Sequence, residues 1–231
     1  MPPKTDTIRL PNDTSRTSII GRTGSGKTFA GVWHLSQQNF DVMPWIVLDF
    51  KGDPLLAQVA ALEGAATITL DDPVPQYPGL YIMRVLPNQK VALNNWLWEV
   101  WDTGYCGIYV DEGYMLNDSD AFDAILTQGR SKHIPVIILS QRPVWLNRFV
   151  FSESNFFQVF HLNDRRDRRT VREFVPANLD VRLEEYNSYY YDVGRDKLVT
   201  FQPVPAEGDI LASILRKLPK PDDRRPRFRA L

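Results

Sequence analysis

Eight residues near the start of the chain constrain its fold more than any other feature. Residues 21–28 read Gly-Arg-Thr-Gly-Ser-Gly-Lys-Thr, which fits the pattern Gly, four residues, Gly-Lys-Ser/Thr without a mismatch. An apolar run, Thr17–Ile20, leads into this loop, and a helical stretch, Lys27–Gln38, leads out of it. Glycines let the backbone curl so that its N–H groups point at phosphate oxygens, and the helix N-terminus adds positive potential. The sequence therefore predicts a phosphate loop that binds a nucleoside triphosphate.

Each position of this loop is a candidate nucleotide contact. We expect Lys27 to place its charge on the β- and γ-phosphates and the Thr28 hydroxyl to complete the coordination of a magnesium ion. The predicted ligands are ATP and Mg²⁺. The predicted nucleotide-binding residues are Gly21, Arg22, Thr23, Gly24, Ser25, Gly26, Lys27 and Thr28.

Two further strand ends carry polar side chains. The apolar run Gly107–Asp111 ends in the adjacent carboxylates Asp111 and Glu112. Asp111 is placed to hold magnesium through a water, and Glu112 to polarise a water for attack on the γ-phosphate, although such a pair can also cap a turn. Gln141 follows the run Val136–Ser140, where an amide can bond both the γ-phosphate and the attacking water. We predict that Gln141 senses the bound nucleotide.

Short apolar runs alternate with longer amphipathic stretches along the chain, which is typical of a parallel sheet covered by helices. The pattern predicts one α/β domain over residues 1–215, with a core at about 15–162 and an elaboration at 163–215 that ends in a hairpin around Gly194. The predicted strands are Thr17–Ile20, Trp45–Phe50, Thr67–Leu70, Leu80–Leu86, Gly107–Asp111, Val136–Ser140 and Phe156–Leu162. The predicted helices are Lys27–Gln38, Leu55–Leu62, Gln89–Trp101 and Ser119–Gln128.

The charge balance and the cysteine content limit the classes of protein to which the chain can belong. The 27 Lys and Arg nearly balance the 28 Asp and Glu, so no global basic field indicates nucleic acid. A single cysteine, Cys106, excludes a disulfide framework within the chain, and no apolar run approaches the ~20 residues of a membrane span. We expect a soluble protein.

The end of the chain is basic. Residues 216–231 carry seven Lys or Arg against two Asp and are interrupted by prolines. We therefore expect an extended basic tail that is solvated or docks on nucleic acid or an acidic partner.

The order of these motifs resembles the FtsK–HerA superfamily of DNA-pumping ATPases. The matching segments are the phosphate loop, Leu48–Asp53 with its Asp-x-Lys-Gly, the strand end Val110-Asp111-Glu112, and Leu139-Ser140-Gln141-Arg142-Pro143. The resemblance covers about residues 18–162. It implies a RecA-like fold of the ASCE class of P-loop NTPases, a hexameric ring and ATP hydrolysis that drives double-stranded DNA through a channel. Because the chain carries no membrane segment or extra domain, it is most similar to the minimal genome-packaging ATPases of tailless, internal-membrane viruses and phages.

That resemblance also implies partners and a place of action. A packaging ATPase of this kind acts on double-stranded DNA and meets proteins of the capsid vertex or of the packaging membrane. It would be found in the host cytoplasm or associated with the virion. Ring ATPases further imply an arginine that reaches the γ-phosphate of the neighbouring subunit. Arg130, just ahead of the Gln141 strand, matches that position.

Several alternatives stay open from the sequence. Arg130 could instead satisfy the end of its helix beside Gly129, and other arginines are rivals for the trans-acting role. These rivals are Arg142, Arg165, Arg166, Arg168 and Arg169. The chain could also be a small-molecule P-loop phosphotransferase with an arginine-rich lid, or an assembly protein that is switched by nucleotide and hydrolyses little.

Overall fold

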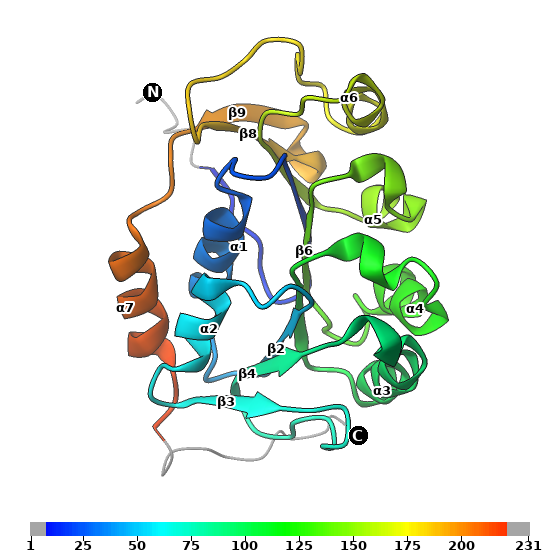
Figure 1. The fold of residues 1–231 in the computed structure, drawn as a ribbon, viewed down its shortest axis with the longest axis vertical. Coiled ribbons are helices and arrows are strands. Elements are labelled where there is room, and N and C mark those ends of the chain that lie inside the picture. The colour runs from blue at the N-terminus through cyan, green and yellow to red at the C-terminus, as the bar shows by residue number, and fades with distance from the viewer. Residues whose placement is uncertain (1–7, 221–231) are drawn as a thin grey trace, which may run out of the picture.

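The computed structural model describes residues 8–220 and arranges its strands in one nine-stranded sheet (Figure 1). Seven neighbouring strands are parallel, and two antiparallel strands extend the sheet at one edge. The order across the sheet is β3 (Ala65–Ile68), β4 (Gly79–Arg84), β2 (Pro44–Asp49), β5 (Gly107–Val110), β6 (Val136–Ser140), β1 (Arg16–Ile20), β7 (Phe156–Val159), β8 (Ser188–Asp192) and β9 (Lys197–Phe201). The expected mostly parallel sheet is confirmed.

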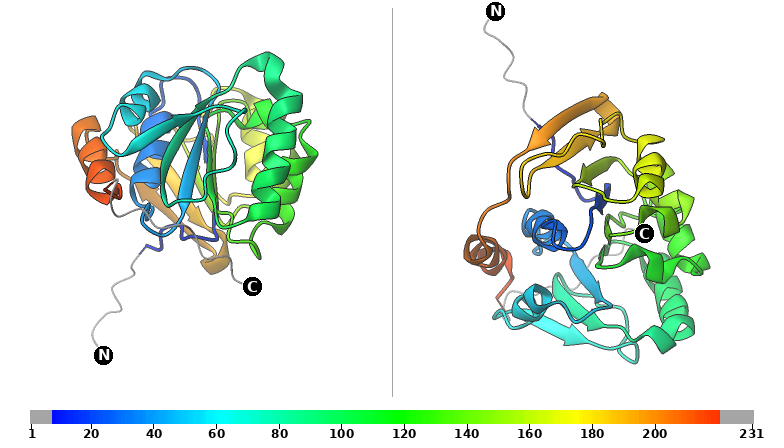
Figure 2. Two further views of the ribbon diagram at one scale, coloured as in Figure 1. Left: turned by 90° about the horizontal axis from the view of Figure 1, so that it is seen from below. Right: turned by 45° about the horizontal axis from the view of Figure 1, so that its top comes forward.

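Helices cover both faces of this sheet, as the view from below shows (Figure 2). One face carries α1 (Lys27–Ser36), α2 (Pro54–Ala60) and α7 (Glu207–Lys217), and the other carries α3 (Lys90–Thr103), α4 (Asp120–Gln128) and α5 (Arg148–Ser152). The helix α6 (Arg165–Arg172) lies near the β8–β9 end. Single 3₁₀ turns occupy Pro87–Gln89, Gly113–Leu116, Pro143–Trp145 and Val193–Arg195. Within residues 8–220, no helix combines the length and the apolar character needed to cross a bilayer.

The central strands are buried because helices pack on both of their faces. All residues of β1, β2 and β6 are buried. One core joins the strands to α3 and α4 and includes Leu97 and Phe122, and a second joins them to α1 and α7 and includes Val32 and Ile214. A third, smaller core lies around β7 and α6. The α4 helix begins where expected, because the Ser119 hydroxyl accepts a hydrogen bond from the Phe122 N–H at 3.1 Å.

The sheet order decides which strand ends meet. The strand β6 lies between β1, which leads into the phosphate loop, and β5, which ends in the acidic pair. The strand β2 lies on the other side of β5. Since these strands are parallel, their carboxyl ends share one edge, and the residues that follow them are brought together there.

The C-terminal part belongs to the same sheet. The predicted hairpin is confirmed as β8 and β9, and it pairs with β7. The helix α7 was not predicted, and it runs to Lys217, whose ammonium donates to the Ser36 carbonyl at 2.6 Å. The prediction that the extended tail begins at Arg216 is therefore wrong by two residues, because Ile210 and Ile214 bury one side of this helix. Residues 221–231 of the predicted tail lie outside the described part of the chain.

Candidate active site

The predicted phosphate loop forms a tight turn between β1 and α1. Gly24 and Gly26 have φ angles of 74° and 91°, a region that favours glycine. A Cβ on Gly21 would stand 2.7 Å from the Cβ of Phe160, so only glycine lets the loop leave β1 this closely. No side chain in the described part of the chain caps the start of α1, so its first N–H groups face the loop without a side-chain acceptor. The Ser25 hydroxyl is buried without a partner among the described residues. This cradle fits a bound phosphate group.

Lys27 is the first residue of α1, and its side chain is buried beside the loop. Burial lowers the pKa of its ammonium, and the nearby charge of Lys51 lowers it further. A polyanion at the loop would offset both effects, because it adds to the negative charge that Glu112, Asp111 and Asp53 already supply. Thr28 follows on the same helix turn and is half-buried.

The two predicted carboxylates lie directly after β5, and both are buried. Neither carboxylate oxygen of Asp111 has a hydrogen-bond partner among the described residues. Burial raises the pKa of Asp111 to about 6, an effect that the charge of Lys51 opposes. A buried carboxylate without donors fits a cation ligand, because a metal ion would replace the lost hydration. Within residues 8–220 no group of three or more His, Cys, Asp or Glu side chains could hold a metal, so a Mg²⁺ here would depend on phosphate and water ligands as well.

Gln141 links the phosphate loop to the acidic strand. It follows β6, between β1 and β5, and its amide donates to Glu112 Oε1 at 2.7 Å. Its own Oε1 accepts a hydrogen bond from the hydroxyl of Thr23 in the phosphate loop. The sequence placed these three residues at separate strand ends, and the structure joins them in one hydrogen-bonded chain.

Lys51 also joins this hydrogen-bonded series, although no role was predicted for it from the sequence. Its ammonium forms an ion pair with the same oxygen, Glu112 Oε1, that Gln141 contacts. Lys51 is positioned by Asp49 at the end of β2, whose Oδ1 accepts from the N–H groups of Lys51 at 3.0 Å and Gly52 at 2.7 Å. Gly52 has a φ of 74°, so the turn suits glycine. The signal that could have found Lys51 was the Asp-x-Lys-Gly at the end of a strand that neighbours the acidic one.

The structure places Arg130 away from all of these residues. It follows α4 and lines a surface depression with Ser15 and Asn155, which directly precede β1 and β7. This is the amino edge of the sheet, opposite the phosphate loop. The Arg130 side chain is exposed and makes no hydrogen bond or ion pair with any described residue, so no contact with the carbonyls that end α4 is formed. Arg130 therefore cannot contact a nucleotide bound to the phosphate loop of its own chain.

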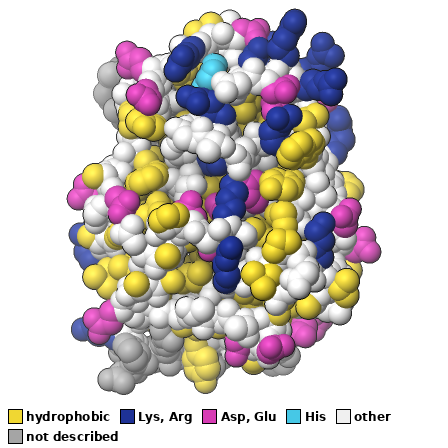
Figure 3. Space-filling model, in the orientation of Figure 1, with side chains coloured by type: hydrophobic (Ala, Val, Ile, Leu, Met, Phe, Trp, Pro, Cys, Tyr) yellow, Lys and Arg dark blue, Asp and Glu magenta, His cyan; other side chains and the backbone are white. Residues whose placement is uncertain are grey.

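The rival arginines differ in whether their side chains form ion pairs with other described residues. Arg142 pairs with Asp164 at 3.5 Å and with Asp167 at 3.3 Å. Arg168 pairs with Asp180 at 3.0 Å. Three arginines of α6 are exposed and make no ion pair within residues 8–220, namely Arg165, Arg166 and Arg169. Basic side chains gather at this end of the molecule (Figure 3).

Comparison with known proteins identifies the family. No profile of a known protein family matches the chain. The DNA packaging ATPase P9 of Enterobacteria phage PRD1 is 50% identical over 218 residues, which cover 89% of this chain and 94% of that protein. The genome packaging NTPase B204 of Sulfolobus turreted icosahedral virus 2, solved with AMPPCP, superposes with a TM-score of 0.66 at 18% identity and covers 84% of this chain and all of that one.

A secretion ATPase shares the same fold. The cytoplasmic domain of the type VII secretion ATPase EccC from Thermomonospora curvata gives a TM-score of 0.58 at 16% identity, over 88% of this chain and 28% of that one. These structural likenesses confirm the predicted RecA-like P-loop fold. The 50% identity over most of both sequences confirms the resemblance to packaging ATPases. The chain is an ATPase that belongs to the family of the DNA packaging ATPase P9.

Proposed function

We propose that this ATPase is a motor that uses ATP hydrolysis to move double-stranded DNA into a virus particle. The observation that carries the proposal is the hydrogen-bonded chain from Thr23 through Gln141 to Glu112, because it links the phosphate loop to a buried carboxylate. The names of the relatives, a DNA packaging ATPase and a genome packaging NTPase, support DNA as the cargo. They favour a motor over a small-molecule phosphotransferase.

Each residue of the site has a proposed role in hydrolysis. The loop 21–28 binds the phosphates, and Lys27 stabilises charge on the β- and γ-phosphates. Thr28 and Asp111 would hold a Mg²⁺ ion, which when bound neutralises charge on the phosphoryl oxygens. Glu112 takes the proton of the attacking water as general base. Gln141 senses the γ-phosphate, because it lies between the phosphate loop and the general base Glu112.

The carboxylate of Glu112 is held through one of its two oxygens. Lys51 and Gln141 both occupy Oε1, while Oε2 is buried without a described partner. Oε2 is therefore the oxygen that would accept from an attacking water, while Lys51 and Gln141 orient the carboxylate through Oε1. A γ-phosphate that draws the Gln141 amide toward itself would remove one of these two contacts, so the orientation of Glu112 would depend on the bound nucleotide.

The assembly and its partners are part of the proposal. We infer a hexameric ring in which Arg130 acts on the nucleotide of the neighbouring subunit, since it lies at the opposite edge from its own phosphate loop. Double-stranded DNA would pass through the ring, and proteins of the capsid vertex or packaging membrane would anchor it. The motor would act in the host cytoplasm or on the virion. Its basic tail would contact DNA phosphates or a partner protein.

The effect of duplex DNA on ATP hydrolysis tests this function. Phosphate release by the full chain should rise several-fold when long duplex DNA is added, because a motor hydrolyses faster when its cargo engages. A nucleoside acceptor should leave the rate unchanged. Phosphate transfer to such an acceptor would favour the phosphotransferase, and tight ATP binding with negligible turnover in every condition would favour the nucleotide-switched assembly protein.

A further inference from the structure

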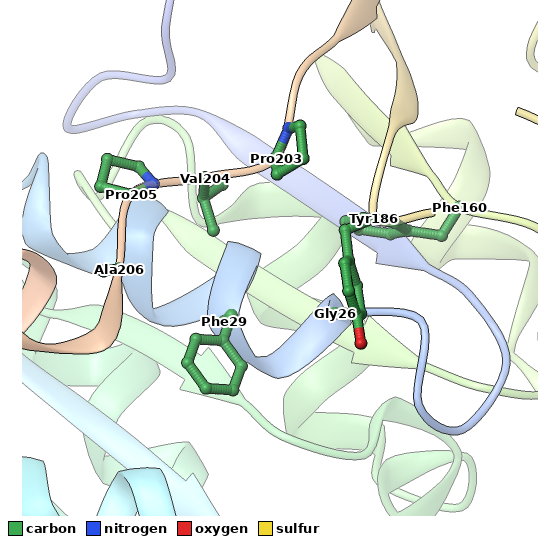
Figure 4. Close-up of a pocket in the computed structure, with 8 residues that line it drawn as sticks. All are labelled: Gly26, Phe29, Phe160, Tyr186, Pro203, Val204, Pro205 and Ala206. Carbon is green, nitrogen blue, oxygen red and sulfur yellow. The ribbon is translucent and has the colours of Figure 1, made fainter. Parts of the chain in front are cut away.

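An apolar pocket of about 310 Å³ opens beside the phosphate loop (Figure 4). Its walls come from the loop, from α1 and from the segment 203–206 that joins β9 to α7, which we call the strap. In Figure 4, Val204 points from the strap toward α1, and the rings of Tyr186 and Phe29 flank the space below it. The lining residues are Gly26, Phe29, Phe160, Tyr186, Pro203, Val204, Pro205 and Ala206.

We infer that this pocket holds the base of the bound nucleotide, and that it accepts purines without distinguishing adenine from guanine. The inference rests on the proposed binding of triphosphate at the loop. Gly26 belongs both to the loop and to the pocket wall, and Phe29 directly follows Thr28. A ribose separates the base from the phosphates by only a few bonds, so a base attached to phosphates on this loop lies within reach of the pocket. Its volume falls at the small end of the range of about 300–1,000 Å³ for ligand pockets.

Tyr186 has the geometry of a residue held in place for contact. Its φ of 61° lies in a region that large side chains rarely adopt. Its ring covers the loop, because a Cβ on Gly26 would stand 3.1 Å from Tyr186 Cδ1. Yet half of the residue is exposed, so core packing does not explain the conformation. Such outliers persist where a surrounding site over-determines them, and a flat aromatic ring beside Phe29 offers a surface on which a base can stack.

The chemistry of the walls explains why base identity would not be read. Among residues 8–220, no charged side chain lines the pocket. Pro203 and Pro205 have no backbone N–H, so two of the four strap residues cannot donate a hydrogen bond to a ring nitrogen of the base. A ring of Tyr186 that stacks on the base contacts its face, and every base has a similar π-face, so stacking does not read the amino group of adenine or the carbonyl of guanine. Sites that bond a specific polar group reject analogues by about 10⁴–10⁵, whereas apolar pockets discriminate far less.

The pocket also gives the C-terminal elaboration a part in nucleotide binding. The strap follows β9, and α7 beyond it packs on α1 through Ile210 and Ile214. Tyr186 lies in the segment ahead of β8. The motor core alone supplies the phosphate site, and the elaboration supplies most of the wall that meets the base.

Binding constants for four ligands test the inference on the wild-type chain. We expect ATP and GTP to bind with Kd values within about 10-fold of each other. CTP should bind more weakly than either, because its single ring covers less of the aromatic walls. Inorganic tripolyphosphate, which has no base, should bind weakest. A preference for ATP over GTP greater than 10-fold would overturn the inference. If tripolyphosphate and all nucleotides fail to bind, the phosphate-loop assignment fails, and the base pocket fails with it.

Two variants and a matched control locate the base. Phe29→Ala and Tyr186→Ala should each weaken ATP and GTP binding by about 10-fold, the loss expected for one stacked ring, and leave tripolyphosphate binding unchanged. Phe149→Ala is the control, because Phe149 is 42% exposed against 39% for Phe29 and lies on α5, away from the pocket. Unchanged ATP binding in both pocket variants would overturn the inference. An equal loss of tripolyphosphate binding would also do so, because the rings would then act through the loop.

Discussion

Replacing Glu112 by glutamine should lower ATP turnover by about 10²–10⁴-fold, the usual contribution of a general base, and leave ATP affinity within a few-fold of wild type. Glutamine keeps the shape of the side chain and an oxygen that can accept from Gln141 and Lys51, so the local fold should survive. It cannot take the proton of an attacking water. Single-turnover phosphate release and equilibrium ATP binding, measured on the same preparation, separate the two effects.

Glu99→Gln is the matched control, because Glu99 is exposed on α3 and no role in the site is assigned to it. It should hydrolyse ATP at the wild-type rate. If Glu112→Gln also hydrolyses ATP within a few-fold of wild type, Glu112 is not the base. A loss of ATP binding in that variant would point instead to a structural role for the buried ion pair with Lys51.

Replacing Arg130 by alanine should cut turnover by about 10³-fold or more and leave nucleotide binding nearly intact. The reason is that a trans-acting arginine stabilises charge that develops in the transition state and contributes little to ground-state binding. The side chain makes no hydrogen bond or ion pair with any described residue of its own subunit, so the thermal unfolding midpoint should change little. Arg130→Lys should restore activity only in part, because lysine lacks the planar fork of guanidinium.

Mixing variants tests whether the arginine acts between subunits. Rings that contain both Arg130→Ala and Glu112→Gln chains should recover some activity, because one interface then joins an intact Arg130 to an intact Glu112. No recovery in rings shown by native mass spectrometry to be mixed would contradict the trans role. In that case the exposed arginines of α6, Arg165, Arg166 and Arg169, become the next variants to measure.

Much of the fold could be predicted because buried parallel strands leave a strong signal. Runs such as Val136–Ser140 are mostly apolar and buried throughout, and polar residues of the site follow their ends. Strand ends were less predictable: β7 stops at Val159, three residues before the predicted end, although Leu162 is also buried. Side chains stay buried after β7 stops pairing with its neighbouring strands, so an apolar run alone does not mark where a strand ends.

The features that were missed depend on contacts across the sequence. The helix α6 is rich in arginine and buries only Asp167 and Val171, so it lacks the apolar stripe that predicts a helix. Lys51 meets Glu112 only because β2 and β5 are neighbours, and strand order cannot be read from one sequence. The pocket beside the phosphate loop depends on how the strap returns to α1 after β9. Nothing in the sequence around Tyr186 indicates that its ring covers Gly26.

Direct observation of DNA movement tests the central claim, that hydrolysis at this site drives duplex DNA. A duplex carrying a triplex-forming third strand would be mixed with the full chain and ATP, and release of the third strand would be followed over time. The account predicts ATP-dependent release by the wild-type chain and none by Glu112→Gln, although both bind nucleotide. If the wild-type chain hydrolyses ATP and binds the duplex but never displaces the third strand, hydrolysis is not coupled to translocation, and the motor assignment is contradicted.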